Sequence, residues 1–264
     1  MTKTAAAPAE TPPAALPLFY KKPVLLRFED HATTGLRSPG DFSFARAAIA
    51  IPVSLGEFAA VQRCYPIVFS SDDLHAPLAV MGLKEGENLF IDEAGHWQGD
   101  CYVPAYVRRY PFIAADAGDG KTKLLTIDTG SDRFVADTAE EPKAARLFDD
   151  KGGPTPAARE AMAFCHAVQE DHARTTAFVA ALMEAKLLTD KHAQMAFPDG
   201  TRYTLDGFMV VDDAAWKRLP AKTLSDWRDH GWLDAVALHR ASGQCWKALL
   251  DRQVGLQSEN SETK

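Results

Sequence analysis

Two adjacent arginines inside an aromatic segment are the residues of this chain best suited to ligand chemistry. Arg108 and Arg109 lie within the segment Glu87–Phe112, flanked by Tyr106 and Tyr110. A guanidinium group forms paired hydrogen bonds with a carboxylate or a phosphate, and aromatic rings stack on its faces. The sequence therefore predicts a site in which Tyr106, Arg108, Arg109 and Tyr110 hold a small anionic ligand.

An internal ion pair is the alternative use of these arginines, and the one that we favour. Adjacent residues of an extended segment point to opposite faces, so only one of the two arginines would face the aromatic side. A buried cation without a partner is strongly destabilising. We therefore expect a nearby carboxylate, such as Asp92 or Asp116, to pair with it.

Trp97 follows a turn at Asp92–Gly95 and is a further candidate for ligand binding. Its indole N–H would be free to donate to a ligand if the ring formed the wall of a groove. Large aromatic side chains are mostly buried, so we favour a role in closing the end of a sheet.

His239, in the C-terminal helical region, is the last candidate. General acid–base catalysis requires a partner within hydrogen-bond reach. Asp234 lies five positions earlier, which is an awkward offset for one helical face. We favour a hydrogen-bonded histidine of the core. In the alternative, His239 joins Tyr106 and either Arg108 or Arg109 in the pocket of an enzyme.

The sequence contains none of the short motifs that mark common catalytic or metal sites. It has no G-x-S-x-G segment and no glycine-rich phosphate loop. The four cysteines are scattered without a C-x-x-C pair, so we expect free thiols. We predict no metal site and no cofactor, and the catalytic residues of any enzyme stay unknown.

Composition is that of an ordinary globular protein, with 264 residues, 46% of them apolar and 25% charged. The net charge of −7 argues against a nucleic-acid partner, which requires a clustered basic surface. The longest apolar run, Ala47–Val53, is far shorter than the ~20 residues of a membrane span.

Both ends of the chain are predicted to be disordered tails, over residues 1–17 and 255–264. The N-terminal segment is rich in alanine and proline and lacks the apolar stretch of a secretory signal. We therefore expect a cytoplasmic protein, while export by a route that recognises a C-terminal signal stays open.

Two segments of the first half resemble each other. Each begins with Tyr-Pro, at Tyr65 and Tyr110, which lie 45 positions apart (110 − 65), and continues as strand, turn and strand. Such a period is typical of a repeated supersecondary unit, although two hairpins also share turn residues by coincidence. In either case we expect one sheet to contain both copies.

The second half changes to a helical period. Thr155 is a predicted N-cap with Pro156 behind it, and helical spacing continues to Leu188 as one bent helix or two shorter ones. Pro198-Asp199-Gly200 predicts the turn of a hairpin. The segment 224–250 is again helical, with an interruption at Gly231.

These features predict an α+β protein, with a mainly antiparallel, twisted sheet from the first half packed by helices from the second. We expect one domain over residues 18–254. It would comprise a β-rich lobe over 18–138 and a helical lobe with the hairpin over 139–254.

Three segments connect the chain to a known family. They are GENLF at 86–90, GHW at 95–97 and YVPAYVRRYPF at 102–112. On these segments, and over about Leu18 to Arg252, the chain resembles the SapC family of bacterial proteins. The family is named for association with a paracrystalline surface layer, the S-layer. Other members resemble companions of outer-membrane uptake receptors.

The resemblance implies a non-enzymatic accessory protein that binds a protein partner of the surface-layer or outer-membrane uptake apparatus. It implies no particular reaction and no catalytic residues. The alternative from the residues themselves is an enzyme with an anion-binding Arg/Tyr pocket. One departure concerns the C-terminal helix, where His239 and Ser242 match the family but Cys245 occupies the usual position of Asn.

Overall fold

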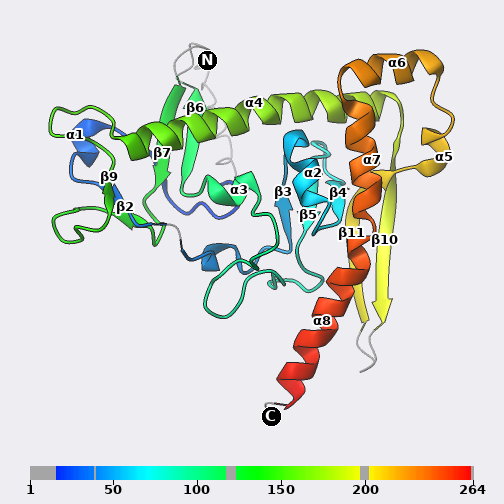
Figure 1. Cartoon of the computed structure of the whole chain (residues 1–264), viewed down its shortest axis with the longest axis horizontal. Helices are drawn as coiled ribbons and strands as arrows, with labels where there is room; N and C mark the ends of the chain where they lie inside the picture. Colours follow the sequence, from blue (N-terminus) through cyan, green and yellow to red (C-terminus); the bar gives the residue numbers. More distant parts are fainter. Residues whose placement is uncertain (1–15, 39, 117–122, 197–201, 263–264) are drawn as a thin grey trace, which may run out of the picture.

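Antiparallel sheets and helices together confirm the predicted α+β class (Figure 1). The computed structural model describes residues 16–38, 40–116, 123–196 and 202–262. The largest sheet has the strand order β10 (Leu188–Ala196), β11 (Arg202–Val211), β4 (Ile67–Ser70), β5 (Pro77–Val80), β3 (Ala50–Pro52). A second sheet contains β1 (Pro23–Leu25), β7 (Lys123–Asp128) and β6 (Phe112–Asp116). The third contains β8 (Phe134–Val135), β2 (Gly35–Leu36) and β9 (Ala145–Arg146).

Short helical turns occur mainly in the first half, and longer helices in the second. The short elements are α1 (Phe28–His31), η1 (Ser43–Ala45), η2 (Leu55–Glu57), α2 (Phe58–Val61), α3 (Ala105–Arg108) and α5 (Asp213–Trp216). The longer ones are α4 (Pro156–Glu184), α6 (Ala221–Asp229), α7 (Trp232–Ser242) and α8 (Cys245–Glu262). Within the described residues, no helix has the length and apolarity needed to cross a membrane.

The expectation that one sheet contains both copies of the internal similarity is wrong. The first copy forms the hairpin β4–β5 and the second forms β6–β7, and these hairpins belong to different sheets. The physical reason is that each hairpin is buried in a separate hydrophobic core. Hairpin β10–β11 joins the five-stranded sheet through β4. Its predicted turn, 198–200, lies outside the described residues.

Helix α4 connects the two cores. It is one continuous helix of 29 residues, about 43 Å long at the usual rise per residue. The Thr155 side chain accepts a hydrogen bond from the Ala158 amide, so the predicted N-cap is confirmed. Figure 1 shows α4 running over β6 and β7 at one end and toward α7 at the other. Cys165 packs in the smaller core, whereas Phe178 and Leu182 pack in the larger one.

The polar stretch in the middle of α4 supports a neighbouring element and does not break the helix. The Leu55 amide donates to Thr175 Oγ1 at 2.8 Å, and the Gly56 amide donates to Asp171 Oδ2 at 3.0 Å. These side chains therefore satisfy the free N–H groups at the start of η2, as helix caps do.

The C-terminal helices follow the predicted interruption. Gly231 separates α6 from α7 and has a φ of +72°, a left-handed conformation that glycine adopts without strain. Helix α8 runs to Glu262 and so extends into the segment 255–264, for which we expect a disordered tail. Of the N-terminal tail expected over 1–17, residues 1–15 lie outside the described part.

Candidate functional site

Arg108 and Arg109 lie in a helical turn, so the expectation of an extended segment is wrong. The amides of Val107 and Arg108 donate to the Pro104 carbonyl at 2.9 and 3.0 Å and form helix α3. The Ala105 amide donates to the buried carboxylate of Glu57 at 2.6 Å, which fixes the start of the turn. Consecutive helical side chains diverge by roughly 100°. Arg108 is accordingly exposed, whereas Arg109 is half-buried.

Arg108 is held by neutral groups. Its Nη2 donates to the Tyr102 hydroxyl at 2.6 Å, and its Nε donates to the Val103 carbonyl at 3.0 Å. Its guanidinium carbon also lies 4.9 Å from the centre of the Phe164 ring on α4. The Tyr102 hydroxyl in turn donates to Glu57 Oε1 at 3.1 Å. The cation is therefore oriented without a direct carboxylate contact among the described residues.

Arg109 stacks on Tyr106, with 4.1 Å between its guanidinium carbon and the ring centre. Its buried Nε has no hydrogen-bond partner. The predicted ion pair with Asp92 is not formed, because Asp92 pairs with His96 at 3.3 Å. The side chain of Asp116, the other expected partner, lies outside the described part. Arg109 thus makes no ion pair with any described carboxylate.

A cavity of about 480 Å³ lies beside the two arginines, and we call it the basic cavity. Among the described residues that line it, a single carboxylate, that of Glu160, accompanies five cations, so the lining is strongly positive. The cations are Arg37, Arg108, Arg109, Arg133 and Lys143. Tyr110, Phe164 and Cys165 contribute further walls. The cavity therefore brings together cations from α3 and from the segments around β2, β8 and β9.

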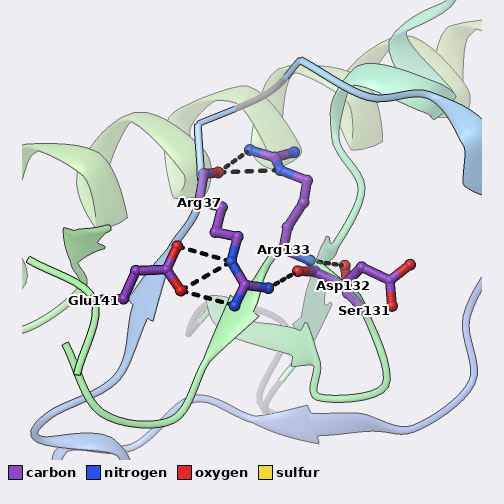
Figure 2. Close-up of polar contacts among 5 residues, drawn as sticks. All are labelled: Arg37, Ser131, Asp132, Arg133 and Glu141. Atoms are coloured by element: carbon purple, nitrogen blue, oxygen red, sulfur yellow. Dashed lines mark hydrogen bonds and ion pairs between the residues drawn. The ribbon is translucent and has the colours of Figure 1, made fainter. Parts of the chain in front are cut away.

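Arg37 and Arg133 both line this cavity. They differ in their hydrogen-bond partners, most of which Figure 2 shows. Arg37 forms a forked ion pair with Glu141, at 2.8 Å from Nε and 2.7 Å from Nη2. The Arg133 guanidinium donates to main-chain carbonyls, those of Tyr110 at 2.8 Å and of Arg37 at 3.2 and 3.3 Å. Burial lowers the pKa of Arg133 from its usual value. Glu141 therefore neutralises the charge of Arg37, whereas Arg133 has no counter-ion among the described residues.

A second cavity of about 440 Å³ lies on the other side of Arg109, and we call it the apolar cavity. Its walls are mostly apolar and come from β3, β5 and α4. Arg109 and Cys165 line both cavities, so the two spaces are neighbours. Burial raises the pKa of the Cys165 thiol to about 11, so this thiol is protonated at neutral pH.

The two tyrosines of the predicted site have different surroundings. Tyr106 lines the apolar cavity beneath Arg109. Tyr110 is buried, stacks on Phe44 at 4.3 Å and donates its hydroxyl to Asp128 at 3.1 Å. It lines the basic cavity and supplies the carbonyl that receives Arg133. Tyr106 therefore faces the apolar cavity and Tyr110 the basic one.

Trp97 and His239 lie in the larger core and line neither cavity. The indole N–H of Trp97 donates to the Tyr65 hydroxyl at 2.9 Å, and the side chain is only 8% exposed. His239 is 5% exposed, and its Nε2 accepts from the Val211 amide at 3.1 Å. Burial lowers the pKa of His239 to about 4. The structure therefore separates these two residues from the arginines.

The polar residues of α7 that match the family connect this helix to the sheet. Ser242 Oγ accepts from the Ile67 amide at 2.9 Å and donates to the His239 carbonyl at 2.5 Å. Cys245 contacts the Gln62 carbonyl through Sγ at 3.2 Å. Across the described residues, no group of His, Cys, Asp or Glu is arranged to hold a metal ion.

Sequence reasoning missed several lining residues, notably Arg37, Arg133 and Lys143 of the basic cavity and Glu57 and Gln169 of the apolar cavity. Arg133 belongs to the internally similar segment that was noticed, but nothing in its spacing from Arg108 indicates contact. The sheet β8–β2–β9 brings Arg37, Arg133 and Lys143 together through pairings distant in the sequence, such as Gly35 with Val135 and with Arg146.

Fold and site together define an α+β protein with a cation-lined cavity next to an apolar one. The chain belongs to the SapC family, since the family model described as SapC matches residues 26–249. Comparison with curated proteins and with solved structures finds no match in either set.

Proposed function

We propose that this protein is a non-enzymatic binding protein that holds a small anionic ligand in the basic cavity. One observation carries the proposal. Arg108, Arg109 and Arg133 line a single cavity, and none of them forms an ion pair with a described carboxylate. An anion entering this space would supply the missing counter-charge.

The energetics of partly buried cations support this function. Burial disfavours the charged form of Arg133, and an opposite charge nearby reverses that effect. The carbonyl contacts hold this guanidinium in place before any ligand arrives, so little side-chain entropy is lost on binding. Guanidinium groups also bind carboxylates and phosphates in a forked geometry. The ligand class is therefore a carboxylate or a phosphate.

Catalysis is less well supported than binding. His239, the expected acid–base partner, is not among the residues that line either cavity. Cys165 lines both cavities, but its raised pKa keeps the thiol neutral, and a neutral thiol is a weak nucleophile.

Family membership supports the biological setting of the proposal. As a SapC member, the protein would serve a surface-layer or outer-membrane uptake system by binding one of its protein components. We place this role in the cytoplasm. All four cysteines are free, which is usual in a reducing compartment.

The test is calorimetric titration of the purified protein with phosphate and with acetate at low salt. We expect saturable binding of at least one anion, weakening as ionic strength rises. Arg109→Gln should weaken that binding at least about tenfold, as loss of a charged hydrogen bond does. Arg228→Gln, which removes an exposed cation on α6 outside both cavities, is the matched control. Equal affinity in wild type and Arg109→Gln, or no binding of either anion, would refute the proposal.

A further inference from the structure

The apolar cavity adjoins the basic cavity, and its walls suit the uncharged part of a ligand. Apolar side chains on three elements form most of its surface, among them Val53, Pro77, Val168 and Val179. Its volume of about 440 Å³ lies in the range of small-molecule sites, roughly 300–1,000 Å³. The space is therefore large enough for several methylene groups.

Among the polar residues of this cavity, Arg109 is the one suited to bind an anionic group, because Glu57 and Thr175 already form hydrogen bonds within the protein. The Glu57 carboxylate is already engaged, because it accepts from the Ser54 and Ala105 amides at 2.8 and 2.6 Å. The Thr175 hydroxyl donates to the Asp171 carbonyl at 2.7 Å. Arg109 has no described acceptor, and it faces the basic cavity as well.

Unmet hydrogen-bonding groups occur at this cavity as well as elsewhere in the described residues, on His239 and Gln253. Two of its lining residues carry a buried polar atom without a partner, Nε of Arg109 and Oε1 of Gln169. Such atoms are uncommon in native proteins and call for an explanation. Of these two atoms, the Arg109 Nε is a donor and belongs to the guanidinium that both cavities share, which supports an anion bound at this guanidinium.

One apolar residue that lines this cavity is strongly exposed to solvent. This residue, Leu74, is 77% exposed, more than any other exposed large apolar side chain in the described part of the chain. Exposed His172 and Thr176 line the α4 side of the same cavity. An apolar group entering from solvent would thus meet Leu74 before it reached Arg109.

We infer that the ligand is an amphipathic anion. Its phosphate or carboxylate group would lie in the basic cavity against Arg109 and Arg133, and its alkyl chain would fill the apolar cavity. Arg109 lines both cavities, so it would contact the ligand where its anionic group joins its alkyl chain. This inference rests on the proposed function and names the class of ligand.

The experiment is calorimetric titration with inorganic phosphate and with methyl, butyl, hexyl and octyl phosphate, below their micelle concentrations. Burial of each methylene group strengthens binding roughly fourfold. We expect octyl phosphate to bind at least about 100-fold more tightly than methyl phosphate, allowing for incomplete burial. Octanol, which lacks the anionic group, should bind far more weakly than octyl phosphate.

Variants that block the apolar cavity test whether the ligand's alkyl chain binds there. Val168→Phe, at a half-exposed position of α4, fills part of the cavity. It should abolish the increase of affinity with alkyl-chain length, while methyl phosphate binds as before. Thr176→Phe, at an exposed lining position, repeats the test if Val168→Phe folds poorly. Ala173→Phe places the same phenyl group at an exposed position of α4 outside both cavities, and this variant should behave as wild type.

The outcomes separate the two proposals. If methyl and octyl phosphate bind equally, or if both blocking variants keep the full gain with chain length, the amphipathic ligand is refuted and the anion site stands. If no phosphate of the series binds, this inference is overturned, and the acetate titration then decides the anion site. Octanol binding as tightly as octyl phosphate would overturn the role of the anionic group.

Discussion

The main-chain carbonyl of Arg37 accepts hydrogen bonds from both Nε and Nη2 of Arg133, at 3.3 and 3.2 Å (Figure 2). The Arg133 amide extends this connection through its bond to Ser131 Oγ at 3.2 Å. Arg37 directly follows β2, and Arg133 directly precedes β8. These two strands pair with each other. The contact therefore fixes one guanidinium of the basic cavity to the sheet that forms its edge.

Replacement of Arg133 by Gln tests this contact. The shorter amide cannot reach the carbonyls of both Arg37 and Tyr110, so the free energy of unfolding should fall by about 1.5–3 kcal/mol, the usual effect of losing a charged hydrogen bond. Urea denaturation measures the change, and phosphate titration should show weaker binding. Arg228→Gln is the control. Unchanged stability together with unchanged phosphate affinity would contradict both roles.

Trp97→Phe should affect stability without affecting ligand binding. The variant loses the indole donor to the Tyr65 hydroxyl, while that hydroxyl keeps its own bond to the Tyr102 carbonyl at 2.9 Å. We expect a loss of about 0.5–1.5 kcal/mol in unfolding free energy and an unaltered affinity for phosphate. Weaker phosphate binding in the folded variant would restore Trp97 as a ligand residue.

Asp128→Asn should lower stability in a pH-dependent way. Burial raises the pKa of this carboxyl, but the amides of Lys21, Lys22 and Gly130 and the Tyr110 hydroxyl outweigh it, so the pKa is lowered. The ionised group therefore stabilises the fold above the ordinary aspartate pKa of 3.8, and this contribution is lost as pH falls through the lower folded value.

We expect Asp128→Asn to be less stable than wild type by about 1–3 kcal/mol at pH 7, with a smaller difference near pH 3. Urea denaturation at the two pH values measures both quantities. Asp132→Asn, at an exposed neighbouring position, should show little difference at either pH. A gap that widened in acid would contradict the assigned direction of the pKa shift.

His239 should make the wild-type protein sensitive to mild acid. Burial lowers its pKa from 6.5 to about 4, so between these values the unfolded chain binds a proton that the folded protein excludes. Stability from this group is therefore complete above pH 6.5 and falls as pH decreases to about 4. The full effect is on the order of 3 kcal/mol.

The variant for this test is His239→Gln, whose amide oxygen can still accept from the Val211 amide. Its unfolding free energy should vary less than that of wild type between pH 7 and pH 4.5. His230→Gln, at an exposed histidine, is the control. Parallel pH profiles for wild type and His239→Gln would show that His239 does not titrate in this way.

Local signals in the sequence predicted much of the fold. The N-cap at Thr155, the hairpin strands β10 and β11 and the interruption at Gly231 each depend on residues close together in the chain. The aromatic segment was harder to predict. Pro104 begins a helical turn there because the carboxylate of Glu57, far away in sequence, accepts the Ala105 amide.

The candidate site was only half predictable for the same reason. Arg108 and Arg109 attract notice because they are adjacent and flanked by tyrosines. Arg133 and Arg37 have no such local context and enter the site through strand pairing. Trp97 and His239 looked equally suitable as types of residue, but the Trp97 indole N–H and His239 Nε2 form hydrogen bonds away from both cavities.

Helix α4 has a mechanical consequence for the whole protein. Its N-terminal part packs in the smaller core, its C-terminal part packs in the larger one, and residues between them line both cavities. This one helix therefore contributes to both cores, and its unfolding would remove buried side chains from each. We therefore expect the two cores to unfold together, and a ligand bound against the middle of α4 to stabilise both.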